Sequence, residues 1–308
     1  MNHRQQKNKK IYKTEDLEYF LREFLELQTK ETTRKNYELI IKDFILFLKI
    51  NNVAAITQDN AETNIKLYRS KLQKLQELAS SSIDNYTLRV QSFNSYLGFN
   101  TKIKKLNSSR TKKYKYLTIN EIQLLLTAVP STTNNKEIIT RNKAIILALF
   151  SCGLRVQELC NIRTGDLIKE NGKTYFLIHG KGRATDETEK IAITQQLQEA
   201  IKYYIHKKKI ISEFLFSSIH GNQLTRQNIN RSLKKIAAET DEIFNTNIKP
   251  RCSSHCFRHS LARYLLVDKK QPISLVKDIL RHSSIETTAK YLTNSEDEIT
   301  ELRETIIL

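Results

Sequence analysis

The sequence predicts a mainly helical protein with two domains: a bundle of about four helices, then an α-rich domain that contains a small antiparallel β-hairpin. Glycine and proline, the residues that most often interrupt helices, are scarce, with 7 and 3 among 308 residues. Apolar residues recur every three or four positions along most of the chain. With 39% hydrophobic residues, a chain of this length can bury the cores of two domains.

The first domain is expected over residues 14–107. Amphipathic helices are predicted to begin near Thr14, Thr32, Ala61 and Ile83. Thr14 is expected to cap the first helix, and the serines at 80–82 are expected to end the third. The apolar faces of these helices predict a compact bundle. Residues 1–13 are basic and polar, and we expect a disordered arm there.

Residues 108–115 are expected to form a basic linker between the domains. No acidic residue lies between Asp84 and Glu121, so the cations in this part of the chain lack a nearby counter-charge. A solvated linker explains this composition about as well as DNA contacts do, but the missing counter-charges favour phosphate contacts. The DNA-binding residues expected in this stretch and on the outward face of the second helix are Arg34, Lys35, Lys102, Lys104, Lys105, Lys112 and Lys113.

The charge of the whole chain indicates a polyanionic partner. The chain has 51 Lys and Arg against 33 Asp and Glu, a formal net charge of +18. Clustered cations gain affinity by displacing counterions from phosphates, so nucleic acid is the expected partner, and a merely lysine-rich composition is the alternative. No apolar run reaches the ~18 residues of a membrane span, so we expect a soluble intracellular protein with no membrane partner.

Four cysteines are present, and we expect them to be reduced and packed in cores. They are Cys152, Cys160, Cys252 and Cys256, too few for a disulfide framework in a chain of this size. One alternative is a zinc site made by Cys252, His255, Cys256 and His259. This cluster lacks the second, distant pair of ligands that structural zinc sites usually have, so no metal is expected.

The second domain is expected over residues 116–308. Thr118 and Glu121 predict a capping box at the start of its first helix. A nearly all-apolar helix is predicted from about Arg141 to Ser151, and Gly153 is expected to break it.

Arg155, directly after this break, is a candidate functional residue. An arginine beside a core helix is costly to bury without an anion. Its guanidinium either offers a fork of donors to a phosphate or lies at the surface, paired with Glu158.

The apolar periodicity then changes to that of strands. Residues 173–178 and 189–193 predict a hairpin, and Lys181 lies in its turn between two glycines. A lysine in an exposed turn is usually only solvated, but a flexible lysine can also protonate a leaving oxygen. Helices are predicted to follow at about 194–208 and 225–238.

The stretch from Ser254 to Tyr291 contains most of the candidate catalytic side chains. Ser254 is expected to cap a helix on which His255 and Arg258, three positions apart, share one face. His282 follows, and a capping box from Ser283 to Glu286 predicts a short helix that carries Tyr291. Cationic and proton-sharing groups near a tyrosine suit an attack by its phenol on phosphorus.

Six candidate residues occur in an order that resembles a known family. They are Arg155, Lys181, His255, Arg258, His282 and Tyr291, in the segments CGLRVQEL, HGKGR, HCFRH and LRHSSIETTAKY. The sequence resembles a tyrosine recombinase of the phage integrase family, and its two-domain layout is similar to that of Xer recombinases. The resemblance implies a SAM-like, DNA-binding core-binding domain over residues 14–107 and a catalytic domain over 116–308.

The resemblance also implies a mechanism. Tyr291 is the nucleophile and forms a 3'-phosphotyrosine link, the arginines Arg155 and Arg258 clamp the scissile phosphate, and Lys181 protonates the leaving 5'-oxygen. His255 and His282 assist by proton transfer and hydrogen bonding. No cofactor or metal is implied, because one phosphoester is exchanged for another.

The implied partners are double-stranded DNA with an inverted-repeat core site and further subunits. Family members act as homo-tetramers through a Holliday junction, sometimes with a second recombinase or accessory proteins, on chromosomes or mobile elements. Residues 299–308 are expected to dock on a neighbouring subunit or to pack on their own domain. The implied location is the prokaryotic cytoplasm, at the nucleoid.

Two positions depart from the family pattern. Family members commonly have glycine where this chain has Arg281, and a small residue where it has Arg263. Arg281 is expected to make an extra DNA phosphate contact or to alter the turn before His282. The alternative functions are a type IB topoisomerase, whose active site resembles that of this family, and a DNA-binding regulator without catalysis. The order of the motifs favours recombination.

Overall fold

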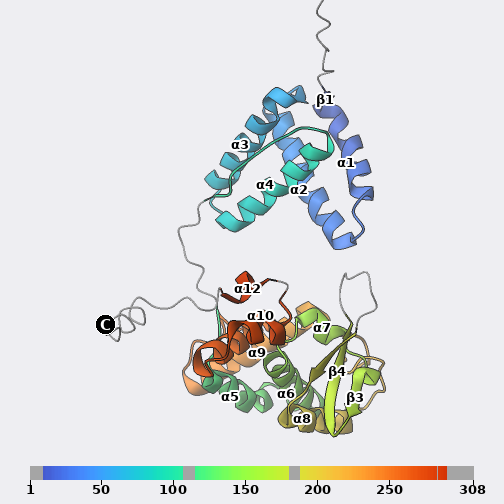
Figure 1. Cartoon of the computed structure of the whole chain (residues 1–308), viewed down its shortest axis with the longest axis vertical. Helices are drawn as coiled ribbons and strands as arrows, with labels where there is room; N and C mark the ends of the chain where they lie inside the picture. Colours follow the sequence, from blue (N-terminus) through green and yellow to red (C-terminus); the bar gives the residue numbers. More distant parts are fainter. Residues whose placement is uncertain (1–9, 107–114, 180–187, 283, 290–308) are drawn as a thin grey trace, which may run out of the picture. The chain divides into compact units, whose positions relative to one another are not determined.

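The chain divides into two compact units, Met1–Lys112 and Lys113–Leu308, each with a hydrophobic core of its own. The structure is a computed structural model that describes residues 10–106, 115–179, 188–282 and 284–289. Figure 1 shows the helices of both units and the small sheet of the second. The predicted mainly helical fold is confirmed. Among the described residues, no helix is both long and apolar enough to cross a bilayer.

Helices make up most of the described part of the first unit. They are α1 (Leu17–Glu26), α2 (Glu31–Ile50), α3 (Gln58–Lys74) and α4 (Ser80–Tyr96). Aromatic rings join them in the core: the Phe24 ring packs edge-on against Phe93, with centroids 5.6 Å apart, and the Phe44 ring against Tyr68 at 5.3 Å. The amphipathic spacing predicted these helices because each helix buries one apolar stripe.

The starts of these helices differ from the sequence-based expectations. Thr14 does not cap α1: it begins a short 3-10 turn (Thr14–Asp16), and its buried hydroxyl donates to the Val53 carbonyl. The serines at 80–82 were expected to end a helix, but they form the first turn of α4. Serine suits a helix start as well as a break, so composition could not distinguish these outcomes.

The end of the expected disordered arm is ordered. Residues 11–13 form a strand, β1 (Ile11–Lys13), which pairs antiparallel with β2 (Ala55–Thr57). The Tyr12 ring lies edge-on to Phe20, with centroids 4.8 Å apart, and this contact holds the strand on the bundle. The expectation of disorder up to residue 13 was therefore wrong for residues 11–13, because tertiary contacts stabilise a strand too short to be recognised in the sequence.

The second unit contains the remaining described helices. They are α5 (Ile119–Ala128), α6 (Lys136–Ser151), α7 (Val156–Asn161), α8 (Gln195–Lys207), α9 (Arg226–Phe244), α10 (Ser254–Arg263), α11 (Ile273–Leu280) and α12 (Ile285–Ala289). The predicted capping box of α5 is present, since Thr118 and Glu121 exchange backbone and side-chain hydrogen bonds. Helix α6 lies in the core and packs against α8 and α10, as Figure 1 shows. It therefore fixes where α10 and the loop after Ser151 lie.

The sheet of the second unit has one strand more than predicted. Its order is β3 (Leu167–Glu170), β4 (Lys173–His179) and β5 (Thr188–Ala192), all antiparallel. Asn171 and Gly172, at φ 49° and 77°, form the two-residue turn between β3 and β4. An Asn-Gly pair is a strong signal for such a hairpin, so the sequence did contain a sign of the missing strand.

Candidate active site

Helix α10 places His255 and Arg258 at the edge of the core of the second unit. Its apolar residues Cys256 and Phe257 are buried in that core, which leaves His255 exposed and Arg258 only 2% exposed. The helix is capped by Ser253, whose hydroxyl accepts from the Cys256 amide at 3.3 Å. The predicted cap was Ser254. Either serine fits the sequence pattern, but only Ser253 has the extended backbone of an N-cap.

Arg258 links the C-terminal ends of two helices that lie far apart in the sequence. Its guanidinium donates to the carbonyls of Gly153, just after α6, and of Leu280, the last residue of α11. Carbonyls at helix C-termini carry partial negative charge and lack partners within the helix, so they suit a buried cation. Gly153, at φ +55°, has no side chain, which lets Leu261 and Leu280 pack close to its backbone. A Cβ there would lie 3.0 Å from a methyl group of each leucine.

Arg155 is the N-cap of α7, and it is the more accessible arginine, with a side chain 49% exposed. Its Nη1 lies 2.7 Å from Glu158, and its Nη2 donates to the Arg281 carbonyl at 3.1 Å. The ion pair with Glu158, one of the two alternatives expected for Arg155 from the sequence, is therefore present. It leaves half of the side chain open to solvent, so pairing with Glu158 and binding an anion are compatible.

His282 lies between the arginines and the last described helix. Its Nδ1 is 2.8 Å from the hydroxyl of Thr288, which is fully buried on α12. Burial, then the positive charges of Arg258 and Arg155, lower the pKa of His282 to about 4. Partial desolvation of the imidazole ring, then the charges of Arg258, Arg155 and Arg226, also lower the pKa of His255. Both imidazoles are therefore neutral near pH 7, ready to accept a proton.

The fold thus brings Arg155, His255, Arg258 and His282 within electrostatic reach of one another. Lys181 and Tyr291, the other expected catalytic residues, lie outside the described residues. The sequence did not single out Thr288 or Arg226. Thr288 had a local signal, because it lies three residues before the candidate nucleophile, whereas nothing local marked Arg226.

The second half of the chain matches a known protein family: residues 115–298, more than half of the sequence, fit the model of the phage integrase family. The chain belongs to this family. A tyrosine recombinase of Pseudothermotoga lettingae is 31% identical over 265 residues, covering 82% of this chain and 84% of the relative. The XerD tyrosine recombinase of Oceanobacillus iheyensis is 27% identical over 292 residues, covering 91% and 93%. The expected tyrosine recombinase is confirmed.

Solved structures of integrases and recombinases share the fold of this recombinase. The Tn1549 transposon integrase in complex with transposon right end DNA has a TM-score of 0.70 at 17% identity, covering 94% of this chain and 98% of that chain. The post-cleavage complex of the XerH site-specific recombinase with its palindromic difH substrate has a TM-score of 0.64 at 20% identity, covering 79% and 69%. At these low sequence identities, the similarity to the two structures shows a shared fold and nothing more.

The zinc alternative finds no support in the structure. No group of three or more His, Cys, Asp or Glu among the described residues is placed to hold a metal ion. Burial raises the pKa of Cys252 to about 12 and of Cys256 to about 11, as for thiols packed in a core. The rings of His255 and His259 pack edge-on with centroids 4.4 Å apart, as neutral imidazoles can.

The Arg281 side chain of this recombinase is directed into the second unit. It is only 8% exposed, and its Nη2 lies 2.8 Å from Glu158. Its contact with a DNA phosphate therefore stays a prediction, and the expected alteration of the turn is not seen, because the left-handed backbone found here is the one that glycine favours. The backbone of Arg281 adopts the left-handed region, φ 56° and ψ 46°, at the end of α11, and packing of the turn directs the side chain inward.

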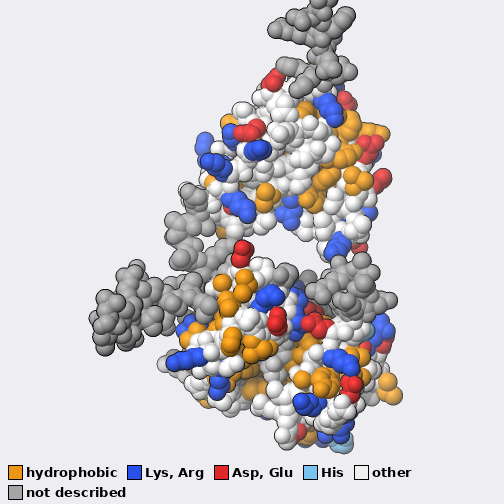
Figure 2. Space-filling view, in the orientation of Figure 1, with side chains coloured by type: hydrophobic (Ala, Val, Ile, Leu, Met, Phe, Trp, Pro, Cys, Tyr) orange, Lys and Arg blue, Asp and Glu red, His pale blue; other side chains and the backbone are white. Residues whose placement is uncertain are grey.

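The other expected DNA-binding residues differ in their surroundings. Lys102, Lys104 and Lys105 are exposed, Lys35 pairs with Glu31 at 2.7 Å, and Arg34 donates to the carbonyls of Leu25 and Gln28 at the end of α1. Lys112 and Lys113 lie outside the described residues. Figure 2 shows further Lys and Arg side chains on the drawn face of the first unit, over α3 and α4. The DNA contacts of the expected DNA-binding residues stay a prediction.

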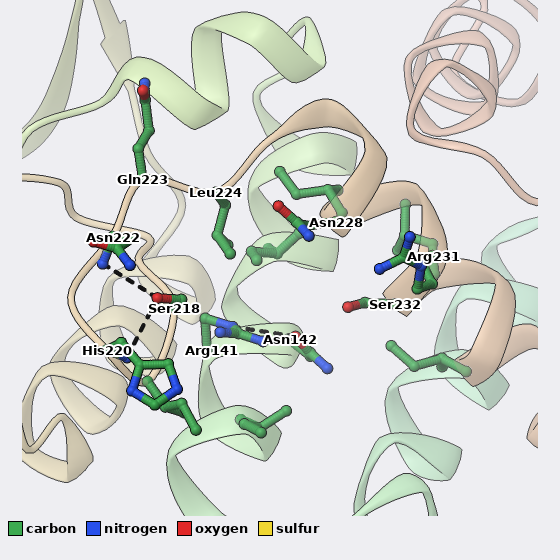
Figure 3. Close-up of a pocket in the computed structure, with 16 residues that line it drawn as sticks. Arg141, Asn142, Ser218, His220, Asn222, Gln223, Leu224, Asn228, Arg231 and Ser232 are labelled. Atoms are coloured by element: carbon green, nitrogen blue, oxygen red, sulfur yellow. Dashed lines mark hydrogen bonds between the residues drawn. The ribbon is translucent and has the colours of Figure 1, made fainter.

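A cavity of about 470 Å³ in the second unit lies between α6, α9 and residues 218–224, apart from the catalytic set. Figure 3 shows Arg141 and Asn142 on α6, facing Ser218 and Asn228 across it. Arg141 is 7% exposed and donates to the Ser217 carbonyl at 2.9 Å. This hydrogen bond holds the 217–224 segment on α6, and none of the four described candidates, Arg155, His255, Arg258 and His282, lines the cavity.

The histidines predict a pH response of the DNA-free protein. We expect His282 to titrate near pH 4 rather than near its ordinary 6.5, and its pKa to rise when a DNA phosphate offsets Arg155 and Arg258. Imidazole ¹⁵N shifts recorded from pH 3 to 8, with and without DNA, measure both values. Assignment uses His282→Gln, and exposed His206 serves as the control. Titration of His282 near 6.5 without DNA would contradict the burial.

The lowered pKa values of His259 and His282 make the stability of the fold pH-dependent. The folded pKa values of His259 and His282, about 4, lie below the unfolded value near 6.5. The unfolded state therefore binds more protons in this window, and stability that is fully present above pH 6.5 is lost as pH falls toward 4. Melting temperatures over this range should fall less in His259→Gln.

Proposed function

We propose that this chain cuts and rejoins double-stranded DNA at a specific site through a 3'-phosphotyrosine link, with Tyr291 as the nucleophile. The observation that carries the proposal is the grouping of two arginines and two neutral histidines, Arg155, His255, Arg258 and His282, in a chain of the phage integrase family. Several fold relatives were solved as complexes with DNA, which supports DNA as the partner.

In the proposed cleavage step, the Tyr291 oxygen attacks the scissile phosphorus, and the bond from phosphorus to the 5'-oxygen breaks. The phenolic proton passes to a neutral imidazole, and Lys181 gives a proton to the leaving 5'-oxygen. Arg155 and Arg258 stabilise the charge that develops on the non-bridging oxygens. The buried Arg258, held by two carbonyls, is preorganised for this role, whereas the half-exposed Arg155 is accessible to incoming DNA.

Rejoining reverses these steps with a 5'-hydroxyl from a second DNA strand. One phosphoester replaces another, so the exchange needs neither ATP nor a metal. We infer a homo-tetramer that holds two DNA sites and passes through a Holliday junction. Each site would be an inverted repeat, so that two subunits bind each DNA duplex symmetrically. Residues 299–308 would dock between subunits, and the reaction would take place at the prokaryotic nucleoid or on a mobile element.

The proposal is tested by trapping the protein on DNA of its own genome and sequencing the ends attached to it. We expect the attached 3'-ends to map to one short sequence and its inverted repeat, with a 5'-hydroxyl on the other side of the cut. Attachment at unrelated sequences, or through a 5'-phosphate, would contradict the proposal. The control variant Lys202→Ala, at an exposed position of α8 outside the predicted DNA-contact residues, should give the same map.

The second candidate is a type IB topoisomerase, because its chemistry uses a similar set of residues. The relatives and structures named above are recombinases and an integrase, and none is named a topoisomerase. Supercoiled plasmids with and without the mapped site distinguish the two functions. A recombinase should act on the plasmid that carries the site, whereas efficient relaxation of both plasmids would favour the topoisomerase.

A further inference from the structure

Arg281 occupies a backbone conformation that glycine adopts more easily. At φ 56° and ψ 46° it ends α11, with its amide bonded to the Asp278 carbonyl at 3.0 Å and the His282 amide to Lys277 at 3.0 Å. A left-handed backbone costs a residue with a side chain about 1 kcal/mol. The turn itself is useful, because it directs the Arg281 carbonyl to Arg155. Glycine would supply that carbonyl equally well, so the side chain requires an explanation of its own.

The Arg281 side chain joins three other parts of the second unit. Its Nη2 lies 2.8 Å from Glu158 of α7, its Nη1 donates to the Cys152 carbonyl at 3.4 Å, and its Nε lies 3.4 Å from Glu189 of β5. Because this arginine is well buried, with 8% of its side chain exposed, removing it is expected to cost more than breaking a surface ion pair. It therefore links the loop after α6, helix α7 and the sheet to the turn that precedes His282.

Glu158 is the contact through which Arg281 reaches the candidate active site. One oxygen of this carboxylate accepts from the Arg155 amide at 2.8 Å and from Arg281 at 2.8 Å, and the other lies 2.7 Å from the Arg155 guanidinium. The carboxylate is 15% exposed. Burial raises its pKa, but the charge of Arg281 and the Arg155 contacts outweigh burial and lower it. Glu158 is therefore ionised and held between two arginines.

We propose that Arg281 is a positioning residue: it orients Glu158, which in turn aims the Arg155 guanidinium at the scissile phosphate. The inference rests on the proposed function for its effect on catalysis. The orientation of Arg155 is a property of the DNA-free protein and does not depend on that function.

The first experiment measures cleavage at saturating protein on a duplex that carries the mapped site and traps the covalent product. Arg281→Gly keeps the backbone turn and removes the side chain. We expect its cleavage rate constant to fall about tenfold, within the range of coupling between residues in contact, with DNA affinity within about twofold of the parent. Arg281→Lys should recover part of the rate, because lysine retains the charge but not the planar fork.

A double-mutant cycle then tests whether Arg281 acts through Arg155. In an Arg155→Ala background, Arg281→Gly should change the rate less than about twofold, because the residue that it positions is gone. An equal loss in both backgrounds would overturn the proposal. So would a loss confined to DNA affinity, which would indicate a direct phosphate contact. Arg163→Ala, which removes an exposed arginine paired with Glu213, is the matched control, and melting temperatures show that each variant is folded.

The second experiment needs no DNA site. Relaxation of the Arg155 side-chain ¹⁵Nε in the DNA-free protein should show greater motion in Arg281→Gly than in the parent or in Arg163→Ala. Unchanged motion would overturn the positioning role. If no site-specific adduct forms, the proposed function fails, and this measurement still decides whether Arg281 orients Arg155.

Discussion

Replacing Tyr291 with phenylalanine should abolish the covalent link to DNA while leaving DNA affinity within about twofold of the parent protein. Phenylalanine keeps the aromatic ring and lacks only the oxygen that is proposed to attack phosphorus. Losing a nucleophile lowers the rate of a covalent step by about 10⁴-fold or more, so the adduct should fall below detection. Denaturing gels measure the adduct, and titration of labelled DNA measures affinity.

The matched control is Tyr203→Phe, which makes the same change on an exposed face of α8. It should form the adduct at the parental rate. A covalent product that persists in Tyr291→Phe would show that another residue is the nucleophile. Loss of DNA binding in that variant would instead show that the phenol contributes to recognition.

Arg258→Ala and Arg155→Ala should both slow cleavage strongly, but only Arg258→Ala should also destabilise the fold. In the proposed mechanism each arginine supplies preorganised positive charge to the phosphate, and losing one such donor costs about 3–4 kcal/mol of transition-state stabilisation. The Arg258 side chain, 2% exposed, also satisfies the Gly153 and Leu280 carbonyls. Leaving two buried acceptors unpaired costs about 1–3 kcal/mol each.

Single-turnover cleavage rates and melting temperatures separate the two effects. Arg155→Ala should retain a melting temperature close to that of the parent, because its side chain is half exposed. Arg231→Ala makes the same change of charge on an exposed part of α9 and should alter neither quantity. Equal melting temperatures for Arg258→Ala and the parent would contradict the structural role of Arg258. An unchanged cleavage rate in either catalytic variant would contradict the phosphate clamp.

Much of the candidate site was predictable because its signals are local. His255 and Arg258 lie three positions apart on one helix, and Arg155 follows a helix break marked by Gly153, so short stretches of sequence show their relation. The helices of both units were predictable in the same way, since an amphipathic stripe repeats every three or four residues. The errors concern positions where local sequence allows two outcomes, such as Ser253 or Ser254 as the cap of α10.

The contacts of Arg281 show what such local signals miss. From the sequence, an extra arginine beside a catalytic histidine in a basic protein suggested a DNA phosphate as its partner. In the structure it meets Glu158 and Glu189, which lie 123 and 92 positions earlier in the chain. Only the packing of α11, α7 and the sheet brings these carboxylates to the turn, where they offset part of the cost of burying the charged guanidinium.

The sequence by itself determined the family and the mainly helical fold of this protein, through its motifs and its helical periodicity, and it supplied the candidate catalytic residues Arg155, Lys181, His255, Arg258, His282 and Tyr291. The tertiary structure decided how the described members of that set are held. The carbonyl partners of Arg258 lie 105 and 22 residues away, and the pKa values of the histidines depend on burial and on arginines from other segments. Residue type is a property of the chain, whereas solvation and the charges nearby exist only once distant segments pack together.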